Sequence, residues 1–495
     1  MSNHFLHDFL YPNSIAFYGA NNRGTGIASF QVMNLILSKF RGQVYPVHLK
    51  LESVMGYKAY KSIAELPEIP DLVIIYLPPE IVPQIFQECG EKGVKRIIIV
   101  SGGFREMIED RNNTYTEEIC EIADHYGIRF IGPNCLGFYN NWIYPEDDTV
   151  ALNTSIWEKL KRGKFSIASQ SGTLSSHIWF DPESIDMGLS KSFSIGNEAN
   201  IDIVDCLEYF KDDDKTEVIG IYIEEIKRGK RFFELAKEIS PKKPIIAIYL
   251  GGTTAAERAV RSHTGSIAGD SKIYGAVFKK AGIIKTELVE EFLDIAMVLS
   301  KGILPKGRRV GIITNSGGPG AMIANHAEKI GLKIPEFSES FQQILRSMTS
   351  HTSSVKNPLD TTFDMNLINY YINLPKAVMK SGEVDLIFMY GVFGFHDVLG
   401  KYLNNERIAK NIDMAEDFSK IKGNLEDILI RPTLKLSKRL SLPIIYINPE
   451  SYSSSWSKKI KACGATLFQF WDRPVRAIAK ICDYVEYKQK FSAES

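Results

Sequence analysis

Short β-branched runs alternate with longer amphipathic segments along almost the whole chain, and this alternation restricts the fold more than any other feature. Runs such as SIAFYGA, DLVIIYLP and RIIIVSGG each end near glycine or proline. Segments with helical spacing of apolar residues, such as EIVPQIFQECGEKG, separate them. Buried runs joined by helices are typical of parallel sheets covered on both faces. The sequence therefore predicts an α/β fold built of parallel sheets.

A repeated stretch divides the chain into domains. KFSIASQSGTLSS (Lys164–Ser176) and RVGIITNSGGPGA (Arg309–Ala321) align without a gap at an offset of 145 positions. Each stretch passes from a basic residue through an apolar strand to Ser-Gly and a helix start, so two related domains are expected. SKGILPKGRR has the glycine, proline and charge content of a linker. The predicted domains are 1–145, 146–303 and 304–495.

Composition narrows the class of protein. Lys plus Arg and Asp plus Glu each number 59, so the basic excess typical of a nucleic-acid binder is missing. The six cysteines form no CxxC pair, which argues against a disulfide framework and a zinc site. The N-terminus lacks a signal-peptide pattern, and no apolar run reaches the ~20 residues of a membrane helix. We expect a cytoplasmic protein that holds no metal of its own.

Two Ser-Gly turns are candidate anion sites. SQSG and NSGGPG both follow an apolar run and precede a helix pattern. Ligands of open α/β sheets bind beyond the carboxyl ends of the strands, where free N–H groups of a helix start favour an anion by ~0.3–1 kcal/mol. The alternative is that the glycines only relieve crowding. Their repetition favours a shared phosphate site.

The first turn, GANNRGTG, departs from the known nucleotide-binding patterns. Gly24 and Gly26 have the spacing of GxGxxG, but Ser29 stands where the third glycine belongs. No lysine follows Gly24, which argues against a Walker A loop. A nucleotide-containing cofactor is compatible with this turn, whereas a dinucleotide has weak support. No motif of the chain predicts a site for ATP and magnesium.

A histidine and a glutamate form the candidate catalytic pair. His263 lies among small residues in RSHTGSIAGD, and Glu224 and Glu225 end the predicted strand VIGIYI. The strand PIIAIYL shortly precedes His263, and two parallel strand ends can lie side by side. A carboxylate there would hold one imidazole nitrogen and leave the other free for nucleophilic attack. The alternatives are an ordinary histidine and two surface glutamates.

Ten motifs in one order resemble the nucleoside-diphosphate-forming acyl-CoA synthetases, relatives of succinyl-CoA synthetase, and above all the α subunit of ADP-forming acetate–CoA ligase. The resemblance covers nearly the whole chain. The motifs are SIAFYGANNRGTGIA, GQVYPV, GYKAYKSIAELPEIPDLVIIYLPPEIV, VSGGF, GIRFIGPNCLG, SQSGTLSS, GNEANIDIVDCLEY, SHTGSIAGD, TNSGGPGAM and VKNPLD. It implies a Rossmann-like CoA-binding domain followed by two flavodoxin-like ligase domains.

The resemblance also implies a reaction and its residues. In this family acyl-CoA and phosphate give an acyl phosphate and free CoA, and the phosphoryl group passes to a histidine and then to ADP. His263 matches the phosphorylated histidine and Glu224 the glutamate that steadies it. The phosphate turns match at Ser171, Gly172, Thr173, Gly317 and Gly318. The CoA positions match at Gly19, Ala20, Asn21, Lys50, Pro78, Pro79, Ser101, Gly102, Asn134, Cys135, Leu136 and Gly137, with Cys135 interpreted as a packing residue.

The chain departs from the family pattern in three places. YLGGTT (Tyr249–Thr254) lacks the usual lysine and arginine, so Arg258 and Arg261 are the remaining basic candidates beside the histidine. Glu225 stands where glycine is common, and HLK (His48–Lys50) where NPK is common. These differences bear on substrate range and catalytic competence.

The sequence also bears on a partner subunit and on two competing functions. Three α/β units account for the chain, so the resemblance implies a separate ATP-grasp β subunit that holds ADP or ATP with magnesium, in an α2β2 assembly. One competing function is a non-catalytic CoA or acyl-CoA sensor on the same scaffold. Another is a nicotinamide-dependent oxidoreductase, which the incomplete GxGxxG disfavours.

Overall fold

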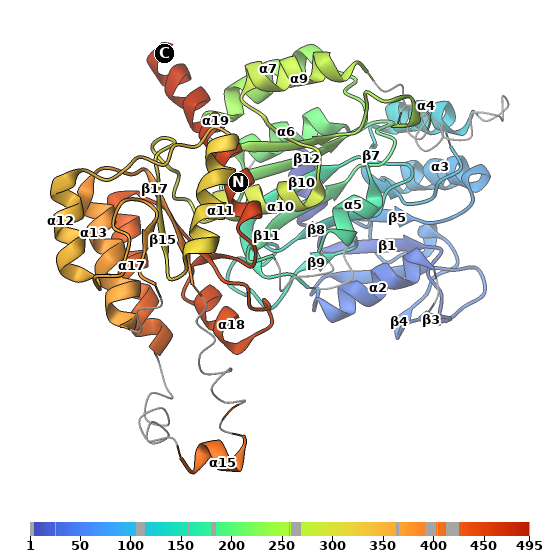
Figure 1. The fold of residues 1–495 in the computed structure, drawn as a ribbon. Helices are drawn as coiled ribbons and strands as arrows, with labels where there is room; N and C mark the ends of the chain where they lie inside the picture. The colour runs from blue at the N-terminus through green and yellow to red at the C-terminus, as the bar shows by residue number, and fades with distance from the viewer. Residues whose placement is uncertain are drawn as a thin grey trace. The chain divides into compact units, whose positions relative to one another are not determined.

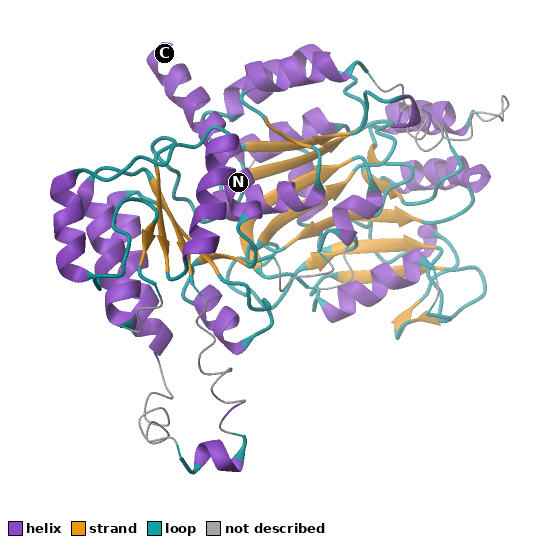
Figure 2. Ribbon diagram, viewed as in Figure 1, coloured by secondary structure: helices purple, strands orange, loops and turns teal. Residues whose placement is uncertain are grey.

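The computed structural model describes residues 4–24, 26–104, 114–155, 159–179, 185–256, 258, 269–362, 366–391, 402, 404–411 and 425–494. The chain divides into two compact units, one of Met1–Pro182 with Met187–Phe292 and the other of Glu183–Asp186 with Leu293–Ser495. Figure 1 follows the chain by colour, and Figure 2 shows the strands of each sheet bordered by helices.

The first sheet has five parallel strands in the order β2-β1-β5-β6-β7. Its strands are β1 (Ser14–Tyr18), β2 (Gln43–Val47), β5 (Leu72–Ile75), β6 (Arg96–Ile99) and β7 (Arg129–Ile131). The neighbouring elements are α1 (Leu6–Leu10), α2 (Ile27–Leu37), α3 (Val82–Lys92), α4 (Tyr115–Tyr126) and the hairpin β3 (Ser53–Val54) and β4 (Tyr57–Lys58).

The alternating side chains of β1 explain why helices cover both faces of this sheet. Ile15 and Phe17 lie in one core cluster with Val32 of α2. Ala16 lies in the other cluster with Phe86 of α3. Successive side chains of a strand point to opposite faces, and each fully buried apolar side chain contributes about 1.5–3 kcal/mol. A continuous apolar strand therefore requires helices on either side.

The second sheet has seven strands in the order β14-β13-β12-β10-β11-β8-β9. Its strands are β8 (Gly137–Asn140), β9 (Leu152–Asn153), β10 (Arg162–Ser169), β11 (Leu189–Ser194), β12 (Val218–Ile223), β13 (Ile245–Tyr249) and β14 (Ile284–Thr286). The helices are α5 (Gly172–His177), α6 (Ile203–Asp212), α7 (Gly229–Ile239), α9 (Ser271–Ala281) and α10 (Val289–Ser300). Strands β10 to β14 are parallel, whereas β8 runs antiparallel to β11. Thus β8, which follows the first sheet directly in sequence, already belongs to the second.

The third sheet lies in the second unit and has the order β16-β15-β17-β18-β19, again parallel. Its strands are β15 (Val310–Thr314), β16 (Leu359–Asp360), β17 (Leu386–Tyr390), β18 (Ile444–Ile447) and β19 (Thr466–Phe468). The helices are α11 (Gly317–Lys329), α12 (Glu339–Met348), α13 (Leu374–Ser381), α15 (Glu406–Ala409), α17 (Leu425–Leu440), α18 (Ser455–Ala462) and α19 (Asp472–Glu494).

The parallel strands of all three sheets follow one topology. Numbered within each sheet, the order is 2-1-3-4-5, the flavodoxin-like order, in which ligands bind at the carboxyl edge where the strand order reverses. The predicted α/β class with parallel sheets is confirmed. The candidate ligand-binding turns are therefore those at the carboxyl ends of β1, β5, β10, β12, β15 and β17.

Candidate functional site

The CoA positions named from sequence all follow parallel strands of the first sheet. Gly19, Ala20 and Asn21 follow β1, Lys50 follows β2, Pro78 and Pro79 follow β5, Ser101 and Gly102 follow β6, and the segment from Asn134 to Gly137 follows β7. Because the strands are parallel, their carboxyl ends lie at one edge of the sheet. The fold thus gathers these residues along a single edge.

Backbone segments approach one another closely where the strand order reverses. Gly19 has φ +90°, and a Cβ at this position would overlap the carbonyl oxygen of Tyr76. The Tyr76 N–H in turn donates to Tyr18 O (3.1 Å). Only glycine combines this backbone angle with this approach. The turns after β1 and β5 are therefore in direct contact.

Ser29, which replaces the third glycine of the dinucleotide pattern, holds the first turn. Its side chain is buried at the start of α2. The Asn21 N–H donates to Ser29 Oγ (3.0 Å), and this hydroxyl donates to Asn21 O (3.1 Å). Asn22 extends the turn to the β3–β4 hairpin, since its Nδ2 donates to Ser53 O (2.8 Å). A hydroxyl thus fixes the loop at the position where a dinucleotide-binding fold keeps glycine.

Two residues of the predicted CoA edge differ in what they offer a ligand. Ser101 Oγ is buried and has no hydrogen-bond partner within the described part of the chain, whereas Ser101 O accepts from the Asn134 N–H (2.9 Å). The thiol of Cys135 is buried and donates to Ile99 O (3.2 Å), and burial raises its pKa to about 12. Ser101 retains hydrogen-bonding capacity for a ligand, while Cys135 packs.

The HLK turn after β2 is shaped by its histidine. Nδ1 of His48 accepts hydrogen bonds from the N–H groups of Lys50 and Leu51, each at 3.1 Å. This is the role that a short polar side chain plays in a turn of this kind. The Lys50 side chain is exposed, so its ammonium group is accessible to an anionic ligand.

The two repeated Ser-Gly turns share an equivalent pair of hydrogen bonds. Ser169 Oγ donates to Ser171 O (2.7 Å) and accepts from the Ser171 N–H (3.2 Å). Thr314 Oγ1 donates to Ser316 O (2.7 Å) and accepts from the Ser316 N–H (3.0 Å). Gly172 and Thr173 open α5, as Gly317 and Gly318 open α11. The sequence repeat therefore corresponds to a structural repeat.

The helix starts differ in the groups that lie beside them. Ser171 Oγ accepts from the Leu174 N–H (3.4 Å) and so caps α5. At α11 the Ser316 side chain makes no cap hydrogen bond, and a Cβ on Gly317 would lie 3.0 Å from Asp360 Oδ2. A carboxylate beside a helix start competes with an anionic ligand. The turn at Ser171 is therefore better suited to phosphate than the turn at Gly317.

Glu224 is placed by its neighbours in the second sheet. Its side chain is 3% exposed, and Tyr222 Oη donates to Glu224 Oε1 (3.3 Å). Strand β12 pairs in parallel with β13, with Ile223 opposite Tyr249, so the expected adjacency of these two strand ends is confirmed. His263 and Arg261 lie outside the described residues, and Arg258 is exposed. The pairing of Glu224 with His263 therefore stays a prediction.

Glu198 is a buried carboxyl group to which the sequence analysis gave no role. It lies in the loop after β11 with φ +53°, and its side chain is 4% exposed. Its Oε1 accepts from the Ile203 N–H (2.8 Å), and burial raises its pKa to about 8 against the nearby Lys227. The signal in the sequence is a glutamate in GNEANID, a glycine-led turn between a strand and a helix.

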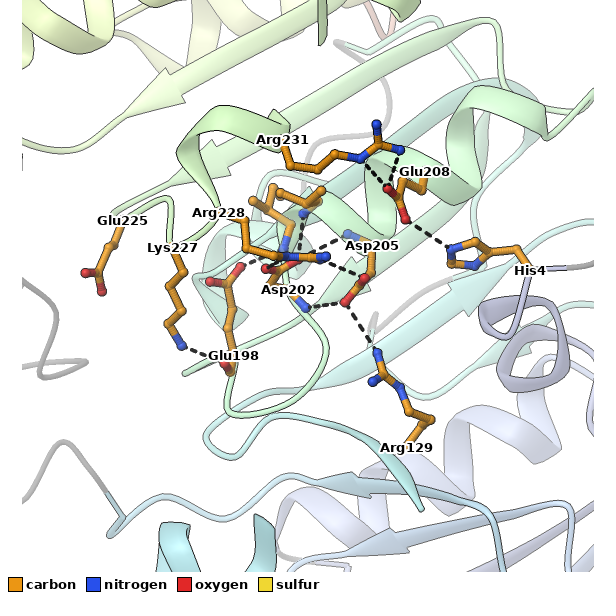
Figure 3. Close-up of polar contacts among 12 residues, drawn as sticks. His4, Arg129, Glu198, Asp202, Asp205, Glu208, Glu225, Lys227, Arg228 and Arg231 are labelled. Atoms are coloured by element: carbon orange, nitrogen blue, oxygen red, sulfur yellow. Dashed lines mark hydrogen bonds and ion pairs between the residues drawn. The ribbon is translucent and has the colours of Figure 1, made fainter. Parts of the chain in front are cut away.

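A network of charged residues extends from Glu198 toward the first sheet (Figure 3). Asp202 caps α6, accepting from the N–H groups of Val204 (2.9 Å) and Asp205 (3.1 Å). Arg228 pairs with both Asp202 and Asp205. Arg129 of β7 lies 3.6 Å from Asp205, so this network joins the two sheets of the first unit.

The described residues lack two kinds of feature. They contain no group of three or more His, Cys, Asp or Glu side chains placed to hold a metal ion. They also contain no helix that is long and apolar enough to cross a membrane.

Two domain families match parts of the chain. Residues 13–141 match the CoA binding domain, and residues 162–299 match the succinyl-CoA ligase-like flavodoxin domain. These matches define the class as a CoA-binding, succinyl-CoA ligase-like protein.

Individual relatives narrow this class. The α subunit of acetate–CoA ligase [ADP-forming] II from Pyrococcus furiosus is 39% identical over 77% of this chain and 80% of its own length. The acetate–CoA ligase [ADP-forming] of Methanocaldococcus jannaschii is also 39% identical, but the match spans only 49% of it. Acetyl-coenzyme A synthetase 1 from Ca. Korarchaeum cryptofilum, solved with phosphate and ADP, superimposes with a TM-score of 0.79 at 26% identity, covering 99% of this chain and 98% of that one. The chain belongs to the ADP-forming acyl-CoA synthetase family.

Proposed function

We propose that the chain is the α subunit of an ADP-forming acyl-CoA synthetase. It interconverts acyl-CoA, phosphate and ADP with a carboxylic acid, CoA and ATP, through an acyl phosphate and a phosphohistidine at His263. The observation that carries this proposal is the gathering of the CoA and phosphate turns at carboxyl sheet edges, in a chain 39% identical to an ADP-forming acetate–CoA ligase α subunit.

The residues at the edge of the first sheet fit CoA. Gly19 lets the first turn come close to the backbone of Tyr76 after β5, Ser101 Oγ is buried without a partner among the described residues, and the Lys50 ammonium group is exposed. These groups supply a backbone cradle, a hydroxyl hydrogen bond and a positive charge for the phosphates. The remaining predicted CoA positions belong to the same proposal.

The second sheet would carry the phosphoryl step. Phosphate attacks the thioester carbonyl, which gives the acyl phosphate and releases CoA. An imidazole nitrogen of His263 then attacks the phosphorus, and the carboxylate leaves. Glu224 would hold the other imidazole nitrogen, and the turn at Ser171–Thr173 would bind the phosphoryl oxygens, because phosphoryl transfer depends mainly on positioning and charge stabilisation.

The partner and the domain boundaries are part of the proposal. An ATP-grasp β subunit, assembled as α2β2, would bind ADP with magnesium and receive the phosphoryl group. Two relatives whose names include "subunit alpha" support a separate partner. The boundaries 1–145, 146–303 and 304–495 and the cytoplasmic location also stay proposals.

The test is phosphorylation of His263. We expect the full chain, mixed with its co-purified partner, acetyl-CoA and radiolabelled phosphate, to carry acid-labile label on the peptide that contains His263. His263→Asn removes the label, while His351→Asn, a change at an exposed histidine of the second unit, keeps it. Label that survives His263→Asn would refute the assignment.

The same experiment distinguishes the proposed function from its alternative. A non-catalytic CoA sensor on this scaffold would bind CoA tightly and remain unlabelled with every nucleotide and partner. The observation that favours a non-catalytic CoA sensor is the lack of basic residues in Tyr249–Thr254.

A further inference from the structure

The turn that carries Glu224 is held by a glutamine from the neighbouring strand. Gln170 directly follows β10 and is 5% exposed. Its Oε1 accepts from the N–H groups of Glu224 and Glu225 (3.1 Å for Glu225), and its Nε2 donates to Glu225 O (2.6 Å). Because Gln170 immediately precedes Ser171, one amide side chain joins the proposed phosphate turn to the proposed carboxylate turn.

Two stacked tyrosines hold the same turn from the other side. Tyr274 Oη of α9 accepts from the Ile226 N–H (3.1 Å). The ring of Tyr274 stacks on that of Tyr249, with centroids 3.8 Å apart and planes at 12°. Tyr249 Oη then donates to Gly269 O (2.7 Å). Gly269 is the first residue described after the segment 259–268, which contains His263.

Glycines make room for this stack. A Cβ on Gly269 would lie 2.7 Å from Cε2 of Tyr274, and a Cβ on Gly251 would overlap the hydroxyl of Tyr249. Gly252 also lies close to the start of α9, since a Cβ at this position would lie 2.5 Å from the side chain of Ser271. Tyr249 and Gly251 belong to the YLGGTT stretch that lacks the usual basic residues.

We propose that Gln170, Tyr249 and Tyr274 are positioning residues for Glu224. Gln170 links the Glu224 turn to the phosphate turn, and the two tyrosines link it to Gly269. The N–H groups of Glu224, Glu225 and Ile226 and the carbonyl of Glu225 are all used by these side chains. The inference rests on the proposed function, because it assigns these three side chains a role in the phosphorylation of His263.

The physical reason is that catalytic geometry tolerates little displacement. A carboxylate that must aim an imidazole loses most of its effect when its backbone shifts by a fraction of an ångström to 1 Å. Gln170 and Tyr274 bond the backbone of the turn, and Gln170 also hydrogen-bonds the buried carboxyl group of Glu198. Both side chains therefore act through the position of the Glu224 turn rather than on the substrate. Removing either side chain's hydrogen bond should therefore lower the rate of phosphorylation and leave ligand binding unchanged.

The test uses the full chain with its co-purified partner, acetyl-CoA and radiolabelled phosphate. Tyr274→Phe deletes one hydroxyl and retains the ring stack, Gln170→Met deletes the amide at similar volume, and Tyr249→Phe deletes the bond to Gly269. Tyr139→Phe is the matched control. Its hydroxyl also accepts from a buried N–H, that of Leu160, at 3.1 Å, and it lies by the amino end of β10.

We expect Tyr274→Phe and Gln170→Met to lower kcat for His263 phosphorylation about tenfold or more. Their KM for phosphate and Kd for CoA should stay within about twofold of wild type. Tyr249→Phe should lower kcat less, because its contact with the turn is indirect. Wild-type kcat in Tyr274→Phe and Gln170→Met, or an equal loss in Tyr139→Phe, would overturn the inference. Absence of label in the wild type would instead overturn the proposed function.

Discussion

Single residues decide how the turns of this chain differ from known patterns. Ser29 holds the first turn where the dinucleotide-binding pattern has glycine, and His48 shapes the second turn, where the family pattern has NPK, through its ring nitrogen. Both substitutions were visible in the sequence as departures. Their structural roles were not, because each depends on a backbone N–H brought close by the fold. A given position in a turn can therefore be occupied by side chains of different chemical types.

Glu198 gives a prediction about pH. Its pKa in the folded chain is raised from 4.5 to about 8 by burial, so the folded state binds a proton that the unfolded state has released. The stability that comes from neutral Glu198 is complete below pH 4.5 and is lost as the pH rises toward 8. Glu198→Gln keeps the oxygen that accepts from Ile203. We expect its thermal midpoint to fall less between pH 5 and 8 than that of the wild type.

The pH series needs an exposed glutamate as its reference. Glu287, with a side chain 81% exposed, serves this purpose as Glu287→Gln. Lys227, Asp202 and Gln170 also act on Glu198, and all three are unchanged in both variants. Parallel pH curves for wild type and Glu198→Gln would contradict the prediction.

At the scale of secondary-structure elements, the two repeated turns were predicted, but their surroundings were not. The repeat at Ser171 and Ser316 was predicted from sequence, and the matching hydrogen bonds of Ser169 and Thr314 confirm that the turns are alike. The carboxylate of Asp360 beside Gly317 was not foreseen. Asp360 lies on another strand, and sequence spacing does not reveal which strand ends become neighbours.

The cap of α6 yields a stability prediction. Asp202 accepts from two N–H groups of the first turn, its own backbone N–H donates to Asp205 Oδ2 (3.1 Å), and its carboxylate pairs with Arg228. Replacing an N-cap aspartate by alanine costs about 0.5–2 kcal/mol, and loss of the Arg228 pair adds to this. We expect Asp202→Ala to lower the free energy of unfolding of the first unit by about 2 kcal/mol or more, measured by urea titration.

A simpler cap provides the comparison for that experiment. Ser454 Oγ accepts from one N–H at the start of α18, that of Ser457 (3.1 Å), and donates to Glu450 Oε2 (3.0 Å). Its side chain carries no charge, so no ion pair is lost with it. Ser454→Ala should therefore lose about 1 kcal/mol or less. Equal losses in the two variants would show that the pairing with Arg228 contributes nothing.

Several of the central parallel strands, but few of the contacts that place the site, followed from the sequence. The apolar runs at Ser14, Leu72 and Arg96 predicted β1, β5 and β6, because a continuous β-branched run between glycine or proline signals suits a buried parallel strand. Strand β8 was not foreseen as part of the second sheet. The stack of Tyr249 on Tyr274 was not foreseen either, because it brings together a strand and a helix that only the tertiary fold makes neighbours.

At the scale of the whole molecule, the parallel strands of all three sheets share one topology. Each parallel sheet has the order 2-1-3-4-5, so each presents its turns at an equivalent edge. In the first sheet this edge carries the proposed CoA site, and in the second it carries the proposed phosphate turn and Glu224. The chain thus assigns different ligand chemistry to copies of one arrangement.

This arrangement predicts where CoA stabilises the chain. At 100 times its Kd, a ligand bound only by the folded state adds about 2.7 kcal/mol to the free energy of unfolding. We expect CoA to slow amide hydrogen exchange at the turns after β1, β5, β6 and β7, and NADH at the same concentration to leave these amides unchanged. Protection by NADH without protection by CoA would favour an oxidoreductase instead.

The position of β8 decides how the chain can be divided for experiments. A recombinant fragment that ends at residue 145 would carry β8 without its neighbour β11 and expose an unpaired strand edge, which promotes aggregation. A fragment that ends at Ile131 would lose the turn from Asn134 to Gly137, in which the Leu136 N–H already donates to Ser194 Oγ of the second sheet (2.9 Å). The first two sheets are therefore best expressed as one polypeptide.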